Sequence, residues 1–247
     1  MISAVVLTKN EEKNIVDCLE SLNFASEIIV VDDNSEDRTL EIARKMGAKT
    51  IIRSLNNNFS NQRNFALSCA KNEWALFVDA DERVTSQLRE EIMEFIKNPK
   101  DFTGAYIRRK DIMWGHVFDF GETGSKKFVR LGKKSAGQWI RPVHEEWVIQ
   151  GKVKTFQNFF FHYPHQSISE FLKEINYYTD IRAKELYENK IQVRWYSVIL
   201  YPKLKFFQNY FLRLGLLDGL PGLIQAMFMS LHSFLVRGKL WLLWQRK

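Results

Sequence analysis

The chain has few cysteines, and its beginning lacks the pattern of a secretory signal. Cys18 and Cys69 are the only two cysteines among 247 residues, too few for a disulfide framework, and they lack the spacing of structural zinc sites. The apolar run at residues 2–7 is short, and charged residues follow it from Lys9 onward, which is unlike a signal peptide. We therefore expect a protein of a reducing compartment that stays on the cytoplasmic side.

Other absences narrow the classes of function. The sequence has no internal repeat, no low-complexity segment and no early glycine-rich loop, and the missing loop argues against a nucleotidyltransferase. It has no basic aromatic motif for recognising RNA or DNA, so we expect no nucleic-acid partner. Hydrophobic residues make up 45% of the chain, which is enough to bury the core of one large α/β domain with an appendage.

Positive charge is concentrated at the end of the chain. After Asn189 there are nine Lys or Arg residues and one acid, Asp218, whereas the first 189 residues hold 27 bases and 28 acids. Aromatic residues such as Trp195 and Trp241 lie among these bases. The pattern suits an anionic membrane surface, with nucleic acid or a merely solvated basic face as the alternatives, and we favour the membrane.

Within this basic tail, residues 219–236 contain no Asp, Glu, Lys or Arg, which reaches the lower length limit of a membrane-spanning helix. Pro221, Gln225 and His232 interrupt the apolar character of the segment. We expect it to lie in the membrane interface, or to be buried on a partner such as a second copy of the chain, rather than to span the membrane.

The first hundred residues alternate short apolar runs with amphipathic helical patterns, which indicates βαβ units and a mainly parallel sheet. Gly47 is expected to end the second helix, Ser60 to cap the third and Thr85 to cap the fourth. The expected strands cover residues 2–7, 28–31, 49–52 and 74–78.

From Gly104 to Phe161 the pattern changes to strand-like pieces rich in aromatics and glycines, which predicts a mixed second half of the sheet. Ser167, with Glu170 in capping-box spacing, opens a long helix. The expected fold is α/β, with one domain at residues 1–165 and a helical region at residues 166–247 that serves membrane association or oligomerisation.

Acidic residues follow two of the expected strands, at the strand ends where open α/β sheets bind ligands. Asp32 and Asp33 follow the second strand, and Asp79 and Asp81 follow the fourth. Carboxylates as close together as this repel one another unless a cation neutralises them. A set of oxygen ligands favours Mg²⁺ or Mn²⁺ as that cation. The alternative is that Asp79 and Asp81 only cap the helix that starts near Thr85.

Four motifs in this order resemble those of family 2 glycosyltransferases with the GT-A fold. They are Thr8-Lys9-Asn10-Glu11, Val31-Asp32-Asp33-Asn34-Ser35, Gln62-Arg63-Asn64-Phe65-Ala66 and Phe77-Val78-Asp79-Ala80-Asp81-Glu82. The resemblance covers residues 1 to about 165, which makes this part the expected catalytic domain. The later segments His144-Glu145-Glu146 and His162-Tyr163-Pro164 resemble the branch that includes lipopolysaccharide-core β-1,4-glucosyltransferases.

The resemblance implies roles at the nucleotide sugar. Asp33 would accept a hydrogen bond from the uracil N–H, and Thr8, Asn10 and Glu11 would face the nucleoside. Arg63 would lie near the nucleotide, or it would pair with the acidic edge as the alternative.

The resemblance also implies a metal site. Asp81 would be the direct ligand of Mg²⁺ or Mn²⁺, and Asp79 would contact ribose or metal-bound water. His162 would add a metal or diphosphate contact, although packing is the favoured interpretation of both His162 and His165.

Transfer with inversion needs a base for the acceptor hydroxyl. The resemblance favours Glu145, with Glu146 as the runner-up, since only one of two neighbours in an alternating strand can face the site. The alternative is that both are surface residues of a strand and His144 is buried. Trp114, Trp139 and Trp147 would stack on sugars or, as we favour, pack in the core.

Together these features predict an enzyme that transfers a hexose, glucose by the resemblance, from a UDP-sugar to a hydroxyl of a lipid-linked or lipopolysaccharide-type glycan. It would act as a cytoplasmic protein bound peripherally to the inner face of the cell membrane. One alternative is a polyprenyl-phosphate sugar transferase, although Glu82-Arg83 stands where those relatives usually carry an Asp-Leu-Gln-like stretch. Another is a catalytically silent membrane-bound scaffold of the same fold.

Overall fold

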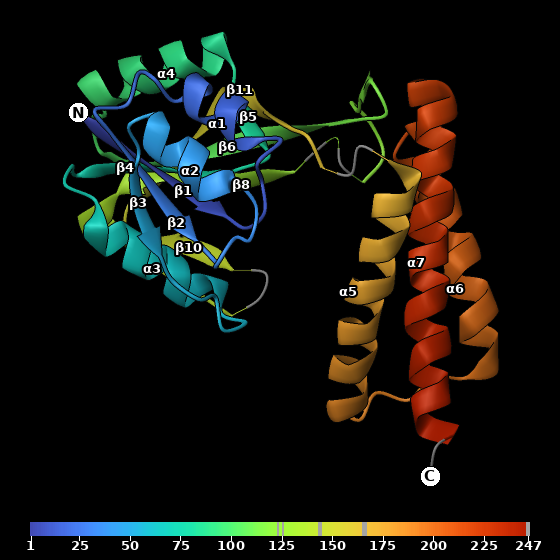
Figure 1. Cartoon of the computed structure of the whole chain (residues 1–247). Coiled ribbons are helices and arrows are strands. Elements are labelled where there is room, and N and C mark those ends of the chain that lie inside the picture. Colours follow the sequence, from blue (N-terminus) through green and yellow to red (C-terminus); the bar gives the residue numbers. More distant parts are fainter. Residues whose placement is uncertain (123, 125, 143–144, 165–166, 246–247) are drawn as a thin grey trace. The chain divides into compact units, whose positions relative to one another are not determined.

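The chain forms two compact units, shown in Figure 1. The structure is a computed structural model that describes residues 1–122, 124, 126–142, 145–164 and 167–245. The first unit comprises Met1–Arg109 and Lys126–His162, and the second comprises Lys110–Ser125 and Tyr163–Lys247. The domain boundary expected between residues 165 and 166 falls outside the described residues and stays a prediction.

The first half of the main sheet is parallel. Strands β1 (Ile2–Thr8), β2 (Glu27–Asp32), β3 (Lys49–Ile52) and β4 (Trp74–Asp79) lie in the order β3-β2-β1-β4. Every residue of β1 is buried, as expected of a central strand that is covered on both faces. The four strands confirm the sequence prediction to within one residue at each end.

The second half of the sheet is mixed, as expected. Beyond β4 the order continues with β8 (Lys127–Lys133), β6 (Phe102–Met113), β11 (Lys152–His162) and β5 (Glu82–Val84). The β4–β8, β8–β6 and β11–β5 pairs are antiparallel. The short β7 (His116–Val117) pairs with the far end of β6, while β9 (Gly137–Ile140) and β10 (Glu146–Ile149) form a separate two-stranded sheet.

Helices cover both faces of the main sheet. One core cluster joins residues of α1 (Ile15–Ser21), α2 (Thr39–Lys45) and α4 (Ser86–Lys97) to alternate residues of the strands. The other cluster joins α3 (Phe59–Cys69) and the β9–β10 sheet to the opposite strand face. A short 3₁₀ turn, η1 (Lys134–Ala136), links β8 to β9. The two clusters confirm the layered α/β fold class.

The helix ends test the predicted caps. The Thr85 side chain accepts a hydrogen bond from Leu88 N and caps α4, and Gly47 ends α2 with a φ of 82°. The prediction for α3 was wrong, because Asn58 is the cap and accepts from Asn61 N. The Ser60 hydroxyl instead donates to Asn58 Oδ1, since Ser60 already lies inside the helix.

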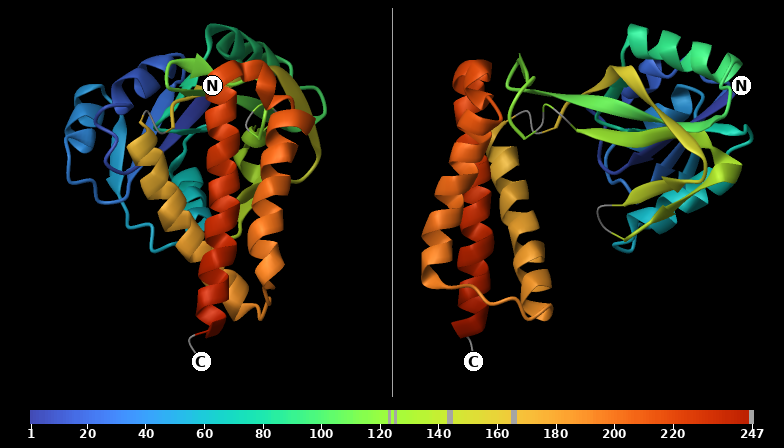
Figure 2. Two further views of the ribbon diagram at one scale, coloured as in Figure 1. Left: turned by 90° about the vertical axis from the view of Figure 1, so that its right-hand side faces the viewer. Right: turned by 180° about the vertical axis from the view of Figure 1, so that it is seen from behind.

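The second unit is mainly helical. The predicted capping box of Ser167 and Glu170 is present and opens α5 (Ile168–Glu188). The chain continues through α6 (Trp195–Phe207), the π-helical turn η2 (Gln208–Leu212), the 3₁₀ turn η3 (Gly215–Asp218) and α7 (Gly219–Gln245). Helix α7 packs against both α5 and α6, as Figure 2 shows. In length and composition alone, Gly215–Gln245 could cross a membrane.

Replacing Ile92 with alanine tests the core beneath α4. Ile92 is fully buried among residues of the first core cluster, so Ile92→Ala should lower the free energy of unfolding by roughly 2–5 kcal/mol. Ile52→Ala is the control, because 55% of that side chain is exposed and its loss should cost no more than about 0.5 kcal/mol. Urea unfolding followed by circular dichroism measures both, and equal losses would contradict the assigned core.

Candidate functional site

The carboxyl ends of β1, β2 and β4 lie side by side. The register pairs Thr8 with Asp32 and Leu7 with Asp79, so the motifs that follow these strands share one edge of the sheet. The loops after β1 and β2 are also joined directly. Asn10 N donates to Ser35 Oγ at 2.8 Å, and Glu36 N donates to Asn10 Oδ1 at 2.8 Å. The structure thus brings two predicted nucleotide-binding motifs into contact.

Asp32 and Asp33 have different surroundings. Asp32 is fully buried and accepts hydrogen bonds from the Ser35 backbone N–H and hydroxyl, which closes the turn. Asp33 keeps part of its carboxylate accessible, while its Oδ1 accepts from Leu55 N at 2.8 Å and its Oδ2 from Lys9 Nζ at 3.0 Å. Asp33 is therefore held in place with a face toward solvent, and Asp32 has a structural role.

Two further residues at this edge have unusual polar groups. The Thr8 hydroxyl is buried and has no hydrogen-bond partner among the described residues. Burial raises the pKa of the Glu11 carboxyl from its ordinary value of 4.5 to about 7, against a hydrogen bond from Asn14 that lowers it, and the charge of Asp81 raises it further. Glu11 is consequently poised to be partly protonated near neutral pH.

Asp79 lies between two arginines. Arg63 Nη2 of α3 donates to Asp79 Oδ1 at 2.8 Å, and Arg130 Nη2 of β8 donates to Asp79 Oδ2 at 2.6 Å. Burial raises the pKa of Asp79, but the charges of Arg130 and Arg63 and their hydrogen bonds hold it well below its usual range. Asp79 is therefore a carboxylate with both oxygens engaged, although 27% of its side chain remains accessible.

Glu82 completes the turn after β4. Its Oε2 accepts from Asp79 N at 2.9 Å, and its Oε1 lies 3.4 Å from Arg130 Nη2 and 3.8 Å from Arg109 Nη1. Full burial and the charge of Asp79 raise the pKa of Glu82, although Arg130 opposes the shift. Because Thr85 caps α4, the alternative that the aspartates are merely its caps is wrong.

Arg63 also holds the predicted base. Its Nε donates to Glu145 Oε1 at 2.9 Å, while its plane stacks 4.7 Å from the Trp139 ring. Arg63 itself is almost fully buried, and its Nη1 makes no hydrogen bond with any described residue. Arg63 therefore pairs with the acidic edge, as the alternative interpretation had it, and also keeps an unused donor.

The two candidate bases point to different environments. Glu145 is 17% exposed and pairs with Arg63, whereas Glu146 is 57% exposed and pairs with Arg141 at 2.7 Å. Glu146 begins β10 on its exposed side, whereas Glu145 precedes the strand. Only Glu145 is linked to the edge that carries Asp79. His144, which precedes them in the motif, lies outside the described residues.

Asp81 and His162 come together from separate elements. His162 Nε2, at the end of β11, lies 3.2 Å from Asp81 Oδ2. The described residues contain no group of three or more His, Cys, Asp or Glu side chains arranged for a metal ion. One carboxylate and one imidazole nevertheless fit a Mg²⁺ or Mn²⁺ ion that takes its other ligands from phosphate and water. His165, the other histidine of the predicted pair, lies outside the described residues.

Two of the three tryptophans named as possible sugar platforms are core packing residues. Trp139 and Trp147 stack on each other with centroids 5.4 Å apart, and both contact Phe77 edge to face within the second core cluster. Trp114 belongs to the second unit and packs near Phe171 and Phe228. The favoured core interpretation is confirmed for the first two.

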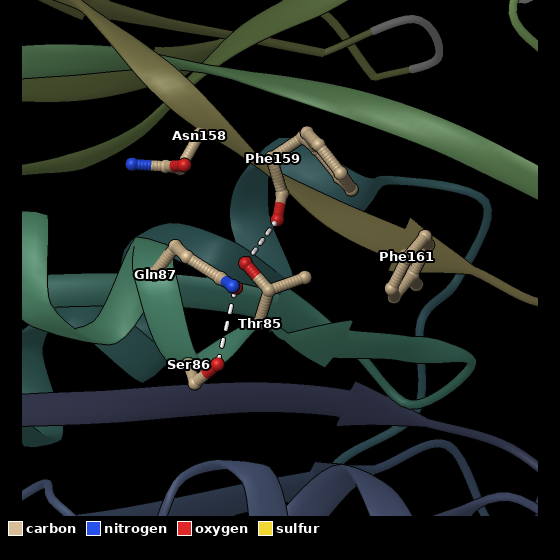
Figure 3. Close-up of a pocket in the computed structure, with 6 residues that line it drawn as sticks. All are labelled: Thr85, Ser86, Gln87, Asn158, Phe159 and Phe161. Carbon is tan, nitrogen blue, oxygen red and sulfur yellow. Dashed lines mark hydrogen bonds between the residues drawn. The ribbon is translucent and has the colours of Figure 1, made fainter.

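A separate pocket of about 540 Å³ lies between the start of α4 and β11 (Figure 3). The Thr85 hydroxyl donates to the Phe159 carbonyl across it at 3.1 Å, and the Phe161 ring forms part of its wall. None of the predicted site residues lines this pocket. The candidate site is thus not this pocket but the edge of the sheet at the carboxyl ends of β1, β2 and β4.

Sequence reasoning missed Arg130 as a site residue. It stands in β8 between Lys127 and Lys133, where the sequence looks like an ordinary exposed basic strand. The available signal was indirect, because three acids at 79, 81 and 82 need cationic partners that Arg63 alone cannot supply.

Comparison with known proteins identifies relatives over most of the chain. Residues 3–149 match the family model described as Glycosyl transferase family 2. A lipopolysaccharide core biosynthesis glycosyltransferase, LpsC of Rhizobium meliloti, is 28% identical over 248 residues, which cover 97% of this chain and 92% of the relative. An uncharacterized glycosyltransferase of Rickettsia typhi is 28% identical over 257 residues, covering 97% and 86% of the two chains.

Solved structures also align with the chain. S. aureus TarS aligns with a TM-score of 0.48 and 19% identity. The alignment covers 73% of this chain and 39% of the TarS chain. Glucosyl-3-phosphoglycerate synthase from Mycobacterium tuberculosis, solved with Mn²⁺, UDP and phosphoglyceric acid, aligns with a TM-score of 0.38 and 18% identity over 45% of this chain and 43% of that chain.

Glu11→Gln should change how stability depends on pH. The folded chain binds the Glu11 proton more tightly than the unfolded chain, so this stabilisation is complete below about pH 4.5 and is lost as pH rises through about 7. Glutamine cannot ionise, so the variant should lose roughly 1–3 kcal/mol less than the wild type between pH 5 and 8. Urea unfolding across this range measures the difference, and parallel pH profiles would contradict the shift.

Proposed function

The chain belongs to glycosyl transferase family 2, and from this membership we propose that it transfers a hexose, glucose in the first instance, from a UDP-sugar to a glycan hydroxyl with inversion at the anomeric carbon. The observation that carries the proposal is the bridge made by Arg63. One guanidinium joins Asp79, at the end of β4, to Glu145, the candidate base, which lies 82 residues after Arg63 in the sequence. Donor-binding and acceptor-activating groups thereby meet at one point.

The nucleotide fits the loops after β1 and β2. Asp33 is held by Leu55 N and Lys9 with part of its carboxylate accessible, which suits an acceptor for the imide N–H of uracil. Asn10, Glu11 and the Thr8 hydroxyl, which has no partner in the part of the chain that the structure describes, share the same edge and would face the nucleoside. Arg63 Nη1, buried without a partner among the described residues, would donate to the diphosphate.

Asp81 and His162 would hold the divalent cation. Their separation of 3.2 Å and partial accessibility suit a shared Mg²⁺ or Mn²⁺, whereas both oxygens of Asp79 already face arginines. A cation bound there neutralises charge that develops on the diphosphate as it leaves. Asp79 would then contact ribose or a water molecule of the metal shell rather than the metal itself.

The chemical step uses Glu145 as the base. The acceptor oxygen forms a bond to the anomeric carbon while the bond from that carbon to the diphosphate oxygen breaks, and the hydroxyl proton passes to the Glu145 carboxylate. UDP leaves with both electrons of the broken bond. Arg63, which pairs with Glu145 before the acceptor arrives, directs the carboxylate at the same edge.

The acceptor is proposed from the relatives and the tail. A lipopolysaccharide core glycosyltransferase is similar over 97% of the chain, which supports an acceptor of the lipopolysaccharide or another lipid-linked type. The excess of basic and aromatic residues after Asn189 supports peripheral binding to the inner, anionic face of the cell membrane. Such an enzyme would meet its acceptor at the membrane surface and draw its donor from the cytoplasm.

Asp81→Ala should abolish the effect of metal on donor binding. With Mn²⁺ present, UDP should bind at least about tenfold more weakly to the variant, a loss of about 1.4 kcal/mol, because one of two proposed protein ligands is gone. Isothermal titration calorimetry with and without Mn²⁺ measures the change, and Asp17→Ala, an exposed acid of α1, is the control for lost charge. UDP affinity that is equally metal-dependent in wild type and Asp81→Ala would sink the assignment.

Glu145→Gln should stop turnover without weakening donor binding. The change removes a base and keeps its shape, so kcat for transfer should fall by about 10²–10⁴-fold while the Kd for UDP stays near that of the wild type. Glu146→Gln is the matched control, because Glu146 is exposed and paired with Arg141. Steady-state transfer assays with UDP-glucose test both, and an inactive Glu146→Gln with an active Glu145→Gln would reverse the assignment.

A further inference from the structure

Helix α6 and the turn η2 expose one apolar face to solvent. Along it lie five large side chains spaced by three or four residues, the spacing of a single helix face: Tyr196, Leu200, Leu204, Phe207 and Phe211. Each of them is more than two-fifths exposed. We call this set the apolar face of α6. A row of this kind on the surface of a protein marks a place where something binds.

Helix α7 has a second exposed row. Leu220, Met227, Phe234 and Trp241 are exposed at intervals of seven residues. Seven-residue spacing also occurs in coiled coils, but those seams are flanked by charged residues that set the pairing. Residues 219–236 contain no charged side chain. The surroundings of this row therefore suit lipid better than a second copy of the chain in water.

Charge on these helices has one sign at the surface. Arg194, Lys203 and Arg213 are exposed beside the apolar face of α6. The single acid after residue 189, Asp218, is buried, and its carboxylate accepts hydrogen bonds from Phe120 N at 3.1 Å and Asp119 N at 3.3 Å. The exposed surface of α6 and α7 consequently carries cations and, among the described residues, no carboxylate.

Helix α5 carries charges of both signs, and its contacts with α7 limit how α7 can bind a membrane. Residues 168–188 contain five acids and three bases. Lys239 Nζ of α7 pairs with Asp180 Oδ1 at 2.8 Å and also donates to the Asn176 carbonyl, so α7 is fastened to this charged helix. A bilayer-spanning α7 would carry α5 and its charges into hydrocarbon, which is costly. The contacts with α5 therefore argue against a membrane-spanning α7.

We propose that the apolar face of α6, with Lys203 and Arg213 beside it, docks into the headgroup region of an anionic bilayer, and that α7 lies against α6 without crossing. The inference rests on the membrane association proposed above and assigns it to named residues. Aromatic side chains such as Tyr196, Phe207 and Phe211 suit the boundary between headgroups and acyl chains, while the cations meet anionic phosphates.

Vesicle flotation with the full chain tests the proposal. The wild type should float with phosphatidylglycerol vesicles, bind phosphatidylcholine vesicles at least about tenfold more weakly, and come off the membrane in alkaline carbonate. The double variant Leu200→Glu/Leu204→Glu should lose at least about tenfold in binding to phosphatidylglycerol, since both side chains lie on the apolar face.

The control is Leu172→Glu/Ile181→Glu on α5, which makes the same change at two exposed aliphatic residues and should bind like the wild type. Equal loss in both double variants, unchanged binding of the α6 variant, or resistance of the wild type to carbonate would each overturn the proposal. So would self-association in solution that the α6 variant alone abolishes.

Hydrolysis of UDP-glucose without vesicles separates this inference from the transfer reaction. Both double variants should keep wild-type hydrolysis, because the candidate site lies in the first unit and the changes lie in the second. A wild type that floats but never hydrolyses donor would contradict the proposed function and leave the docking face standing. A wild type that hydrolyses donor but does not float would contradict the docking face and leave the proposed function standing.

Discussion

The structure depends most on the neutralisation of Asp79. Its carboxylate lies at the end of a strand whose other residues are buried, where an unpaired charge would be costly, and Arg63 and Arg130 supply two cations from different elements. Glu82 extends the set by holding Asp79 N and facing Arg130 and Arg109. Strands β4, β5, β6 and β8 and helix α3 thus converge on one network. Removing a single member of such a network costs about 3–5 kcal/mol.

The same network explains why the Gln62-Arg63-Asn64 motif is more than a nucleotide contact. Gln62 Nε2 donates to the Arg53 carbonyl, and the Asn64 amide exchanges two hydrogen bonds with the backbone of Trp139. Three successive residues therefore hold three separate segments. By holding β9, which pairs with β10, Asn64 also helps to place Glu145, the residue just before β10 that reaches Arg63. The position of the candidate base is consequently set by a helix about 80 residues earlier in the chain.

The sequence predicted the elements that local pattern determines. The first four strands were found because strands buried on both faces read as apolar runs, and Thr85 and Ser167 were found because caps are local. The α3 cap was misplaced because Asn58 and Ser60 are both residue types that cap helices well, so the sequence offers two starts two residues apart.

Pairings between distant residues could not be read in the same way. The sequence does not show that Arg130, rather than a neighbouring lysine, faces Asp79. A shift of one residue in the register of β8 would turn the Arg130 side chain to the other face of the sheet. The separation of Glu145 from Glu146 was predicted in form, because alternation allows only one to face the site. Which of the two it is depends on the contact with Arg63. The grouping of residues 110–125 with the second unit was likewise not foreseen.

That grouping has a consequence for the order of folding. Phe120 and its hydrogen-bond acceptor Asp218 are separated by 98 residues. On a ribosome that adds about 5–20 residues per second, Phe120 therefore waits about 5–20 seconds until Asp218 has been synthesised. During that time the backbone N–H groups of Asp119 and Phe120 lack the carboxylate that accepts from them in the folded chain. The hydrogen bonds that tie these two residues to Asp218 therefore form only after most of the chain has been synthesised.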